Sequence, residues 1–344
     1  MTTRAPAQGE DAGKARTPVM RDVARLAGVS HQTVSRVLNG HANVSDTARE
    51  RVETAIAQLG YRRNVSARAL ITKRTMTLGV VSVSAQQYGP ASTLTGISQA
   101  ARQAGYFVSV SVLDTVDRHS MRSAIDHLMA AAVDGVIVIA PVGPVVEAVA
   151  GLSRTVPLVM VEARGGEQSV AGIDQVDGAR AATRHLLELG HRTVAHIRGP
   201  INWFEADARV SGWLTELMAA HAPVPEVLVG DWSSRSGYEA GRRILERSDV
   251  TAVFAANDQM ALGLLRALEE AGRSVPGDIS VVGFDDLPES EFFHPPLTTV
   301  RQDFAEVGRR CLAEIVARID GTTPPSASLI VPELIVRDST AAPR

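Results

Sequence analysis

The chain has 344 residues, of which 45% are hydrophobic and 21% charged, and this is the composition of an ordinary folded protein with a large core. Its one cysteine, Cys311, rules out an internal disulfide framework and is typical of a reducing compartment. The net charge of −3 hides an asymmetry, because residues 16–75 carry eleven Lys and Arg against four Asp and Glu, whereas residues 76–344 carry 22 against 32.

Residues 1–17 form a small-residue and polar lead that we expect to be disordered. They lack the apolar segment of a secretory signal, and no stretch of the chain reaches the roughly 20 apolar residues that span a bilayer. We therefore expect a cytoplasmic protein without membrane contact. A basic segment joined to an acidic body suggests a polyanionic partner for the basic segment alone.

Residues 18–62 have the pattern of a helix-turn-helix domain. A first helix is expected over 20–26, Gly28 allows the positive φ of a sharp turn, and Ser30 caps a second helix. A third helix is expected from Ser45 to about Gln58. The apolar residues predicted to face the shared core are Val23, Leu26, Val34, Val37, Leu38, Val52, Ile56 and Leu59.

The first turn of the second helix, His31-Gln32-Thr33, points away from this core, and Arg36 follows one turn later. In a helix-turn-helix these positions meet base edges in the major groove of double-stranded DNA. Gln pairs bidentately with adenine and Arg with guanine, so the pattern predicts base reading. The alternative is an ordinary helical hairpin with polar outer residues.

In MRDVARLAGVSHQTVSRVLNG and VSDTARERVETAIAQLGYRRN, the chain resembles the lactose-repressor (LacI/GalR-type) family of bacterial transcription regulators. The resemblance implies a repressor whose affinity for operator DNA is controlled by a small-molecule effector. It makes His31, Gln32 and Arg36 the specificity positions of the recognition helix. The DNA-binding residues that we predict are Ser30, His31, Gln32, Thr33, Ser35, Arg36, Asn39, Asn64, Ala67 and Leu70.

Residues 63–75 connect this domain to the rest of the chain. Their core, residues 64–70, could form only about two helical turns, which are not stable alone in water. The resemblance assigns the segment to a hinge helix that orders on operator DNA, where Leu70 wedges between base pairs and Ala67 packs beside it. The alternative is a plain linker with a buried leucine.

From Met76 onward, short apolar runs alternate with helical stretches, which indicates βαβ units and parallel sheets. Most runs are continuously apolar, as is typical of strands buried on both faces. The expected strands are 78–84, 107–113, 135–140, 157–162, 193–199, 226–231, 252–257 and 279–286, and the expected helices include 92–104, 175–190, 258–271 and 303–319. Two doubly wound sheets suit this many strands better than one, so the fold class is α/β behind a small all-α head.

Ligands of such sheets bind beyond the carboxyl ends of the strands, and polar residues gather there. Glu162, Asn257 and Asp285 end strands, and Arg209 and Trp232 follow strands. Carboxylate, guanidinium and amide groups bind vicinal hydroxyls, and an aromatic face stacks on a sugar ring, so the pattern predicts a polyol site. Each residue has an alternative: Asn257 and Asp285 could be caps, Trp232 could be core, and Arg209 could pair with a surface acid.

The resemblance continues from about Leu78 to the C-terminus, closest in ANDQMALG, DISVVGFDD and HPPLTTVRQDF. It implies a periplasmic-binding-protein-like core, 76–344, of an N-subdomain (about 76–173 and 303–331) and a C-subdomain (about 174–302 and 332–340). The effector-binding residues that we predict are Glu162, Arg209, Trp232, Asn257, Asp285, Gln302 and Phe304.

The wall at residues 82–88 departs from this pattern, and Ile139 stands where a polar residue is expected. We interpret the half of the effector site that faces a galactoside as retained from the family pattern. The part of the site that meets a second sugar or an aglycone is altered. The expected effector is a sugar, a β-galactoside or a relative, that acts as an inducer. A purine corepressor is the alternative, since the purine-binding branch uses matching Arg and Asp positions.

No pattern of an enzyme is found. Cys311 falls in the apolar stripe of a helix, the histidines 185, 191 and 196 are not spaced as a zinc site, and there is no phosphate-binding glycine loop. We therefore expect no catalytic residues, no metal and no cofactor.

A sugar-binding transport protein is a further alternative from another class. Such a protein would need a signal peptide and would have no use for residues 20–70. The C-terminal VRDSTAAPR lacks leucine heptads, so we expect a homodimer on a pseudo-palindromic operator.

Overall fold

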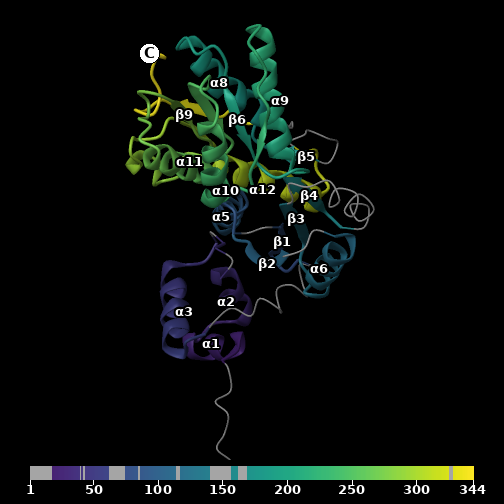
Figure 1. The fold of residues 1–344 in the computed structure, drawn as a ribbon. Coiled ribbons are helices and arrows are strands. Elements are labelled where there is room, and N and C mark those ends of the chain that lie inside the picture. The colour runs from purple at the N-terminus through teal and green to yellow at the C-terminus, as the bar shows by residue number, and fades with distance from the viewer. Residues whose placement is uncertain are drawn as a thin grey trace, which may run out of the picture. The chain divides into compact units, whose positions relative to one another are not determined.

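A computed structural model of the protein describes residues 18–38, 40–41, 43–61, 74–83, 86–113, 117–139, 156–161, 169–324 and 328–344. The predictions for Asn39, Asn64, Ala67, Leu70 and Glu162 therefore lie outside the described residues. The chain divides into two compact units, Met1–Lys73 and Arg74–Arg344, each with its own hydrophobic core (Figure 1).

The first unit contains α1 (Met20–Ala27), α2 (His31–Leu38) and α3 (Asp46–Leu59), so the predicted helix-turn-helix is confirmed. Gly28 adopts a φ of 64°, and Ser30 Oγ accepts a hydrogen bond from Thr33 N at 3.1 Å at the start of α2. The prediction that Leu26 faces the core is wrong. Leu26 is 50% exposed, because the buried stripe of α1 runs through Val23, Ala24 and Ala27.

The second unit contains two parallel sheets, and the first has the strand order β2-β1-β3-β4-β5. Helices α5 (Tyr88–Gln103) and α12 (Phe304–Asp320) pack on one face, and α6 (Arg118–Ala130) packs on the other. We call this sheet and these helices the N-subdomain. Its strands are β1 (Thr77–Val83), β2 (Phe107–Leu113), β3 (Gly135–Ile139), β4 (Leu158–Val161) and β5 (Ser169–Ala171).

The second sheet has the order β7-β6-β8-β9 and, with its helices, forms the C-subdomain. Helices α8 and α9 cover one face, and α10 and α11 cover the other. The strands are β6 (Ala195–Arg198), β7 (Leu228–Val229), β8 (Ala252–Ala255) and β9 (Ser280–Val282). The helices are α8 (Gln175–Glu188), α9 (Phe204–Ala219), α10 (Ser234–Leu245) and α11 (Asp258–Glu270), with a 3-10 turn at Ser290–Phe292.

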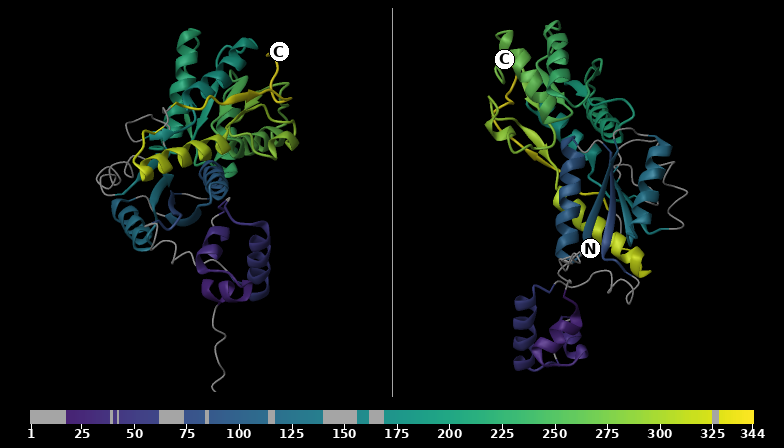
Figure 2. Two further views of the ribbon diagram at one scale, coloured as in Figure 1. Left: turned by 180° about the vertical axis from the view of Figure 1, so that it is seen from behind. Right: turned by 90° about the horizontal axis from the view of Figure 1, so that it is seen from below.

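The chain crosses between the two subdomains after β5, between β10 (Thr299–Arg301) and α12, and again before β11 (Glu333–Ile335), which pairs antiparallel with β10. Helix α12 returns to the N-subdomain and packs against α5, as Figure 2 shows in yellow and blue. A Cβ added at Gly96 or Gly308 would collide with the backbone of the opposite helix. This close crossing packs the middle of α5 against the first turn of α12, and the first turns of both helices line the cleft between the sheets.

The α/β fold class is confirmed, and the differences from prediction lie at the strand ends and edges. The strand predicted over 279–286 ends at Val282, and the chain then leaves the extended region at Asp285 and Asp286, whose φ values are 111° and 52°. Strand β2 is not buried on both faces, since it is an edge strand with Phe107 63% exposed. The short strands β5, β10 and β11 were not predicted. Among the described helices, none is long and apolar enough to cross a membrane.

Candidate functional site

The outer face of α2 carries most of the predicted base-reading residues. His31, Gln32 and Arg36 are exposed, while Val34 and Val37 on the opposite face are buried in the core of the first unit. Ser30 caps the first turn of α2 through its hydroxyl, which also lies 2.9 Å from Thr33 Oγ1. The helix thus presents a polar, exposed N-terminal turn on a fixed scaffold, which is what a groove-reading helix requires.

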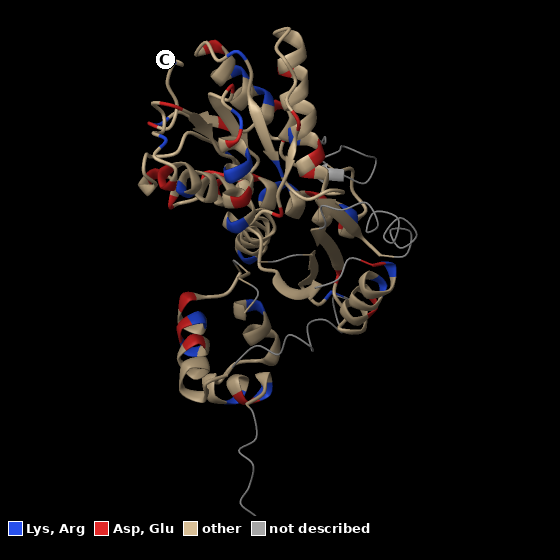
Figure 3. Cartoon of the chain, in the orientation of Figure 1, with Lys and Arg blue, Asp and Glu red and all other residues tan. Residues whose placement is uncertain are grey.

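The positive charge of residues 16–75 is concentrated in the sequence that follows the three helices rather than in the helices themselves. Residues 18–61 contain five Arg against four Asp and Glu (Figure 3), and one of the arginines, Arg25, pairs with Asp22 at 3.1 Å. Residues 62–74 contain five Lys and Arg and no acidic residue. The positive charge predicted for the head therefore belongs mainly to the segment that joins it to the second unit.

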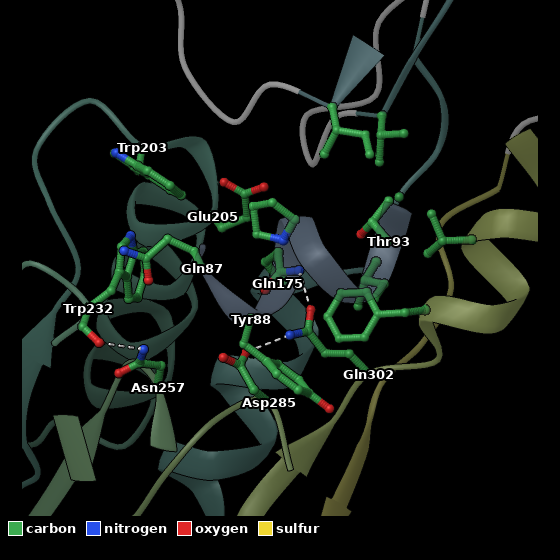
Figure 4. A pocket seen from close by; sticks show the side chains of 18 of the residues that line it. Gln87, Tyr88, Thr93, Gln175, Trp203, Glu205, Trp232, Asn257, Asp285 and Gln302 are labelled. Carbon is green, nitrogen blue, oxygen red and sulfur yellow. Dashed lines mark hydrogen bonds between the residues drawn. The ribbon is translucent and has the colours of Figure 1, made fainter. Parts of the chain in front are cut away.

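A cavity lies between the N- and C-subdomains, and the empty space within it, part of which is open to solvent, is about 740 Å³. It is lined from the N-subdomain by the first turns of α5 and α12 and by the ends of β3 and β4, and from the C-subdomain by the strand ends and the start of α9 (Figure 4). The predicted residues that line it are Arg209, Trp232, Asn257, Asp285, Gln302 and Phe304.

Four of the cavity residues form one continuous polar network. Gln302 Nε2 donates to Asp285 Oδ1 at 2.6 Å, and Arg209 Nη2 lies 3.4 Å from the same oxygen. Arg209 Nε donates to Gln175 Oε1 at 2.9 Å, and Gln175 Nε2 donates to Gln302 Oε1 at 2.7 Å. Arg209 Nη1 also donates to the carbonyl of Ala256. The network presents both donors and acceptors to the cavity, as hydroxyl recognition requires.

Burial sets the electrostatics of this network. It raises the pKa of Asp285 to about 7, against the charge of Arg209, which favours the ionised carboxylate. Burial also lowers the pKa of Arg209, whose guanidinium stacks 3.8 Å from the ring centre of Phe284. Arg209 is thus not a surface residue paired with a surface acid, so that alternative is excluded.

Asn257 has both of the roles that were considered for it. Its Oδ1 accepts from Met260 N at 2.9 Å and so caps α11, while its Nδ2 donates to the carbonyl of Trp232 at 3.1 Å. Trp232 is likewise buried in the hydrophobic core of the C-subdomain and lines the cavity. These two residues therefore tie the wall of the cavity to the start of α11.

Two acidic residues next to the predicted site are structural. Asp258 is buried outside the cavity lining and accepts hydrogen bonds from Leu287 N, Ser290 Oγ and Thr299 Oγ1 at 2.9, 2.6 and 2.6 Å. Burial nevertheless raises its pKa to about 6. Asp286 pairs with Arg301 and Arg337, both at 2.7 Å, and does not line the cavity.

The histidines and the cysteine lie away from the cavity. His196 stacks between Trp213 and Phe254 in the C-subdomain core, and Cys311 is buried within α12. Among the residues that the structure describes, no cluster of three or more His, Cys, Asp or Glu could hold a metal ion.

Similarity to known proteins decides the family. The model for bacterial regulatory proteins of the lacI family matches residues 19–64, and the periplasmic binding protein-like domain matches residues 183–340. The lactose operon repressor of Escherichia coli (strain K12) is 35% identical over 326 residues, which are 94% of this chain and 90% of that repressor. The chain belongs to the lacI family.

Other members of the lacI family give the same result. The regulator CelR of Thermobifida fusca is 37% identical over 94% of this chain and 98% of its own. A crystal structure of the Lac repressor dimer bound to operator and the anti-inducer ONPF matches with a TM-score of 0.83 and 34% identity, over 95% of this chain and all of that one. A CelR–cellobiose complex matches with a TM-score of 0.69 and 35% identity, over 94% and 99%.

As a member of the lacI family, the chain is a DNA-binding transcriptional repressor with a helix-turn-helix head and an effector domain of the periplasmic-binding type. Several cavity residues were not predicted as effector-binding residues, among them Gln175, Trp203 and Glu205 in the C-subdomain. Glu205 had a detectable signal, because it lies four residues before Arg209 and so on the same face of α9. Gln175 and Trp203 had none, since one begins α8 and the other directly precedes α9.

Proposed function

We propose that the effector is a sugar and that it acts as an inducer. The observation that carries this proposal is the buried network of Arg209, Asp285, Gln302 and Gln175 on the cavity wall. Its groups can each hold two hydrogen bonds to neighbouring hydroxyls, and Trp232 adds an apolar face for a sugar ring.

The shape of the aromatic walls favours a sugar over the alternative purine. Tyr88 and Phe304 meet edge to face at 81°, and Trp203 and Trp232 meet at 68°. Neither pair offers the parallel sandwich that would hold a flat base on both faces, whereas a chair-shaped ring can stack on one ring and touch the edge of the other. The relatives include both kinds of repressor by name, the lactose and ribose operon repressors and PurR. A β-galactoside or another β-linked sugar is our preferred class.

On the DNA side, we propose that the exposed residues of α2 read base edges and that residues 63–75, with Ala67 and Leu70, form the hinge at the operator centre. A homodimer would present two such heads to a pseudo-palindromic operator. We further propose that the protein binds its ligand without turnover and, because operator DNA is cytoplasmic in bacteria, that it acts in the cytoplasm.

The mechanism is a coupling between the cavity and the head. A sugar held by both subdomains stabilises the closed state of the cleft. It shifts the equilibrium between the open and closed states only if it binds the two states with different affinity. That closure would move the N-subdomain, from which the segment of residues 63–75 leads to the head. Coupling of this type is worth about 1–3 kcal/mol, which is roughly 5- to 150-fold in operator affinity.

The test is a gel shift of the purified protein on fragments of its own genome, with and without sugars and purines. We expect one or a few fragments to be retained over bulk competitor DNA and to be released by one sugar. Retention strengthened by a purine would instead establish the corepressor alternative. Equal binding to all fragments under every condition would refute the proposed function.

A further inference from the structure

Asp285 has a backbone conformation that residues other than glycine rarely adopt. Its φ is 111°, and that of Asp286 is 52°, so two successive residues lie on the positive side. A conformation of this kind persists only where the surrounding structure holds it in place. The position of the Asp285 carboxylate in the cavity wall therefore depends on what holds this turn.

A single residue, Asp258, is hydrogen-bonded to both ends of the turn. Its backbone N donates to the carbonyl of Phe284 at 2.9 Å. Its Oδ2 accepts from Leu287 N, also at 2.9 Å. Phe284 directly precedes Asp285, and Leu287 directly follows Asp286. The two residues with positive φ thus lie between two hydrogen bonds to the same residue.

The carboxylate of Asp258 also connects this turn to the strand that leads to Gln302. Its Oδ1 accepts from Thr299 Oγ1 at 2.6 Å, and its Oδ2 accepts from Ser290 Oγ at 2.6 Å. Thr299 begins β10, three residues before Gln302, which donates to Asp285 (Figure 4). Asp258 therefore contacts the segments that carry two members of the polar network.

Asp258 is itself held firmly and lies behind the cavity wall. It is the first residue of α11, directly after the cap Asn257, and its side chain is fully buried. A Cβ added at Gly283 would overlap Asp258 Oδ1, so the chain before the turn passes close against the carboxylate. Asp258 does not line the cavity and can affect a ligand only through its neighbours.

We propose that Asp258 is a positioning residue of the effector site, which sets the place of the Asp285 carboxylate and, through Thr299, that of Gln302. This inference rests on the proposed function, because it requires an effector that binds at Asp285. The donors to the Asp258 side chain are two hydroxyls and a backbone amide, all of them neutral. The role therefore depends on where the acceptors lie rather than on the charge of Asp258.

The test measures sugar affinity of the full-length protein by isothermal titration calorimetry. The probes are lactose, cellobiose, methyl β-galactoside and methyl β-glucoside, and the tightest binder is used for every variant. The titrations are made at pH 8, because burial raises the pKa of Asp285 to about 7. Asp258→Ala should lower the affinity by about tenfold or more, since a displaced Asp285 loses a hydrogen bond from the sugar to a charged acceptor.

The conservative variant distinguishes geometry from charge. In Asp258→Asn the amide oxygen can accept from Leu287 N and Ser290 Oγ, while the amide group can donate to Thr299 Oγ1. We expect this variant to bind the sugar within about threefold of the wild type. Hydrogen exchange without ligand gives a second measurement, in which the amide of Leu287 should exchange faster in Asp258→Ala but not in Asp258→Asn.

A second pair of variants decides the question if Asp258→Ala does not fold. Thr299→Val keeps the shape of the side chain but removes the donor to Asp258, and should lower sugar affinity by about threefold or more. Thr299→Ser keeps the hydroxyl and should restore the affinity.

Glu216→Ala is the matched control for a buried acid in the same subdomain. Glu216 accepts from Arg180 and Arg184 at 2.7 Å each and does not line the cavity. Its removal should lower the melting temperature and leave sugar affinity within about twofold of the wild type.

The outcomes separate this inference from the proposed function. If no sugar binds the wild type, both are overturned. If a sugar binds but Asp258→Ala or Thr299→Val keeps the wild-type affinity, the positioning role is overturned and the sugar effector stands. The same holds if Asp258→Asn binds as weakly as Asp258→Ala, or if Glu216→Ala loses as much affinity. Selective loss in Asp258→Ala and Thr299→Val, with recovery in Asp258→Asn and Thr299→Ser, establishes the role.

Discussion

The guanidinium of Arg209 and the carboxylate of Asp285 lie 3.4 Å apart, and both side chains are buried in the wall of the cavity. The pair joins α9 to the loop after β9, two segments that are 76 residues apart in the sequence. Removing one partner from a buried pair leaves an uncompensated charge, which is more costly than the pair is stabilising. The pair therefore has to be tested by a substitution that keeps its shape.

Asp285→Asn is that substitution. The amide oxygen can still accept from Gln302 Nε2, but the negative charge that would receive sugar hydroxyls is lost. Because burial raises the pKa of Asp285 to about 7, the comparison is made at pH 8, where the wild-type carboxylate is ionised. We expect effector affinity to fall by about 100-fold, since two hydrogen bonds to a charged acceptor become neutral ones. Operator binding without effector should be unchanged, which gives a repressor that does not respond to its sugar. The measurements are calorimetric titration of the sugar and gel shifts over a range of sugar concentrations.

The matched control for this substitution is Asp286→Asn, because Asp286 is the next residue and pairs with Arg301 and Arg337 outside the cavity. It should lower the melting temperature, because it removes two ion pairs, and should have little effect on sugar affinity. Normal induction in Asp285→Asn would remove Asp285 from the effector site.

The cap on the recognition helix predicts a second effect. Ser30→Ala removes the acceptor for Thr33 N, and the loss of such a cap costs about 1 kcal/mol. We expect faster amide exchange in the first turn of α2 and weaker operator binding, with sugar binding unchanged. Ser30→Thr keeps the acceptor and should restore both properties.

Ser45→Ala is the control for Ser30→Ala, because Ser45 caps α3 through Ala48 N at 3.4 Å. It should destabilise the first unit by a similar amount but weaken DNA binding less. If both variants lose operator affinity equally, overall stability of the head explains the result, and the cap on α2 has no particular role in DNA reading.

Much of this arrangement was predictable from local pattern, and the exceptions have physical causes. The place of Arg209 and Asp285 in the cavity wall was predicted because ligand sites of parallel sheets lie beyond the strand ends, which is a short-range feature. Gln175 was not found, because it gains its role from Gln302, which is 127 residues away and reaches it only after the chain has crossed back between the subdomains. Leu26 was assigned to the core on spacing alone, but Val23, Ala24 and Ala27 already fill the narrow contact of α1.

Gln32 gives a prediction about sequence preference rather than affinity. Its side chain is exposed on the first turn of α2 and is free of the core. If it pairs with adenine, Gln32→Ala should lose about 1–3 kcal/mol of discrimination at one base pair in each half-site. Selection from a pool of randomised operators measures this directly. Gln58→Ala, the same substitution on an exposed position of α3, should leave the preferred sequence unchanged. A uniform loss over all sequences would make Gln32 a backbone contact.

The buried His196 predicts how stability depends on pH. Its ring is stacked 4.7 Å from Phe254 and 5.3 Å from Trp213, and its Nδ1 lies 2.9 Å from the carbonyl of Phe254. Burial lowers its pKa from 6.5 to about 3, with only a partly opposing effect of that hydrogen bond. The unfolded chain therefore binds a proton below about pH 6.5 that the folded chain does not bind, so stability is lost as the pH falls from there toward 3.

His196→Phe should remove this loss while keeping the aromatic stack. At pH 7.5 the variant should be less stable by about 1 kcal/mol, because the carbonyl of Phe254 loses its partner. As the pH falls, the wild type should lose stability faster than the variant, so the two curves of unfolding free energy should converge and then cross between pH 6.5 and 4. Urea unfolding followed by circular dichroism over this range measures both curves. Parallel curves would mean that His196 binds its proton equally in the folded and unfolded protein, which would contradict the lowered pKa.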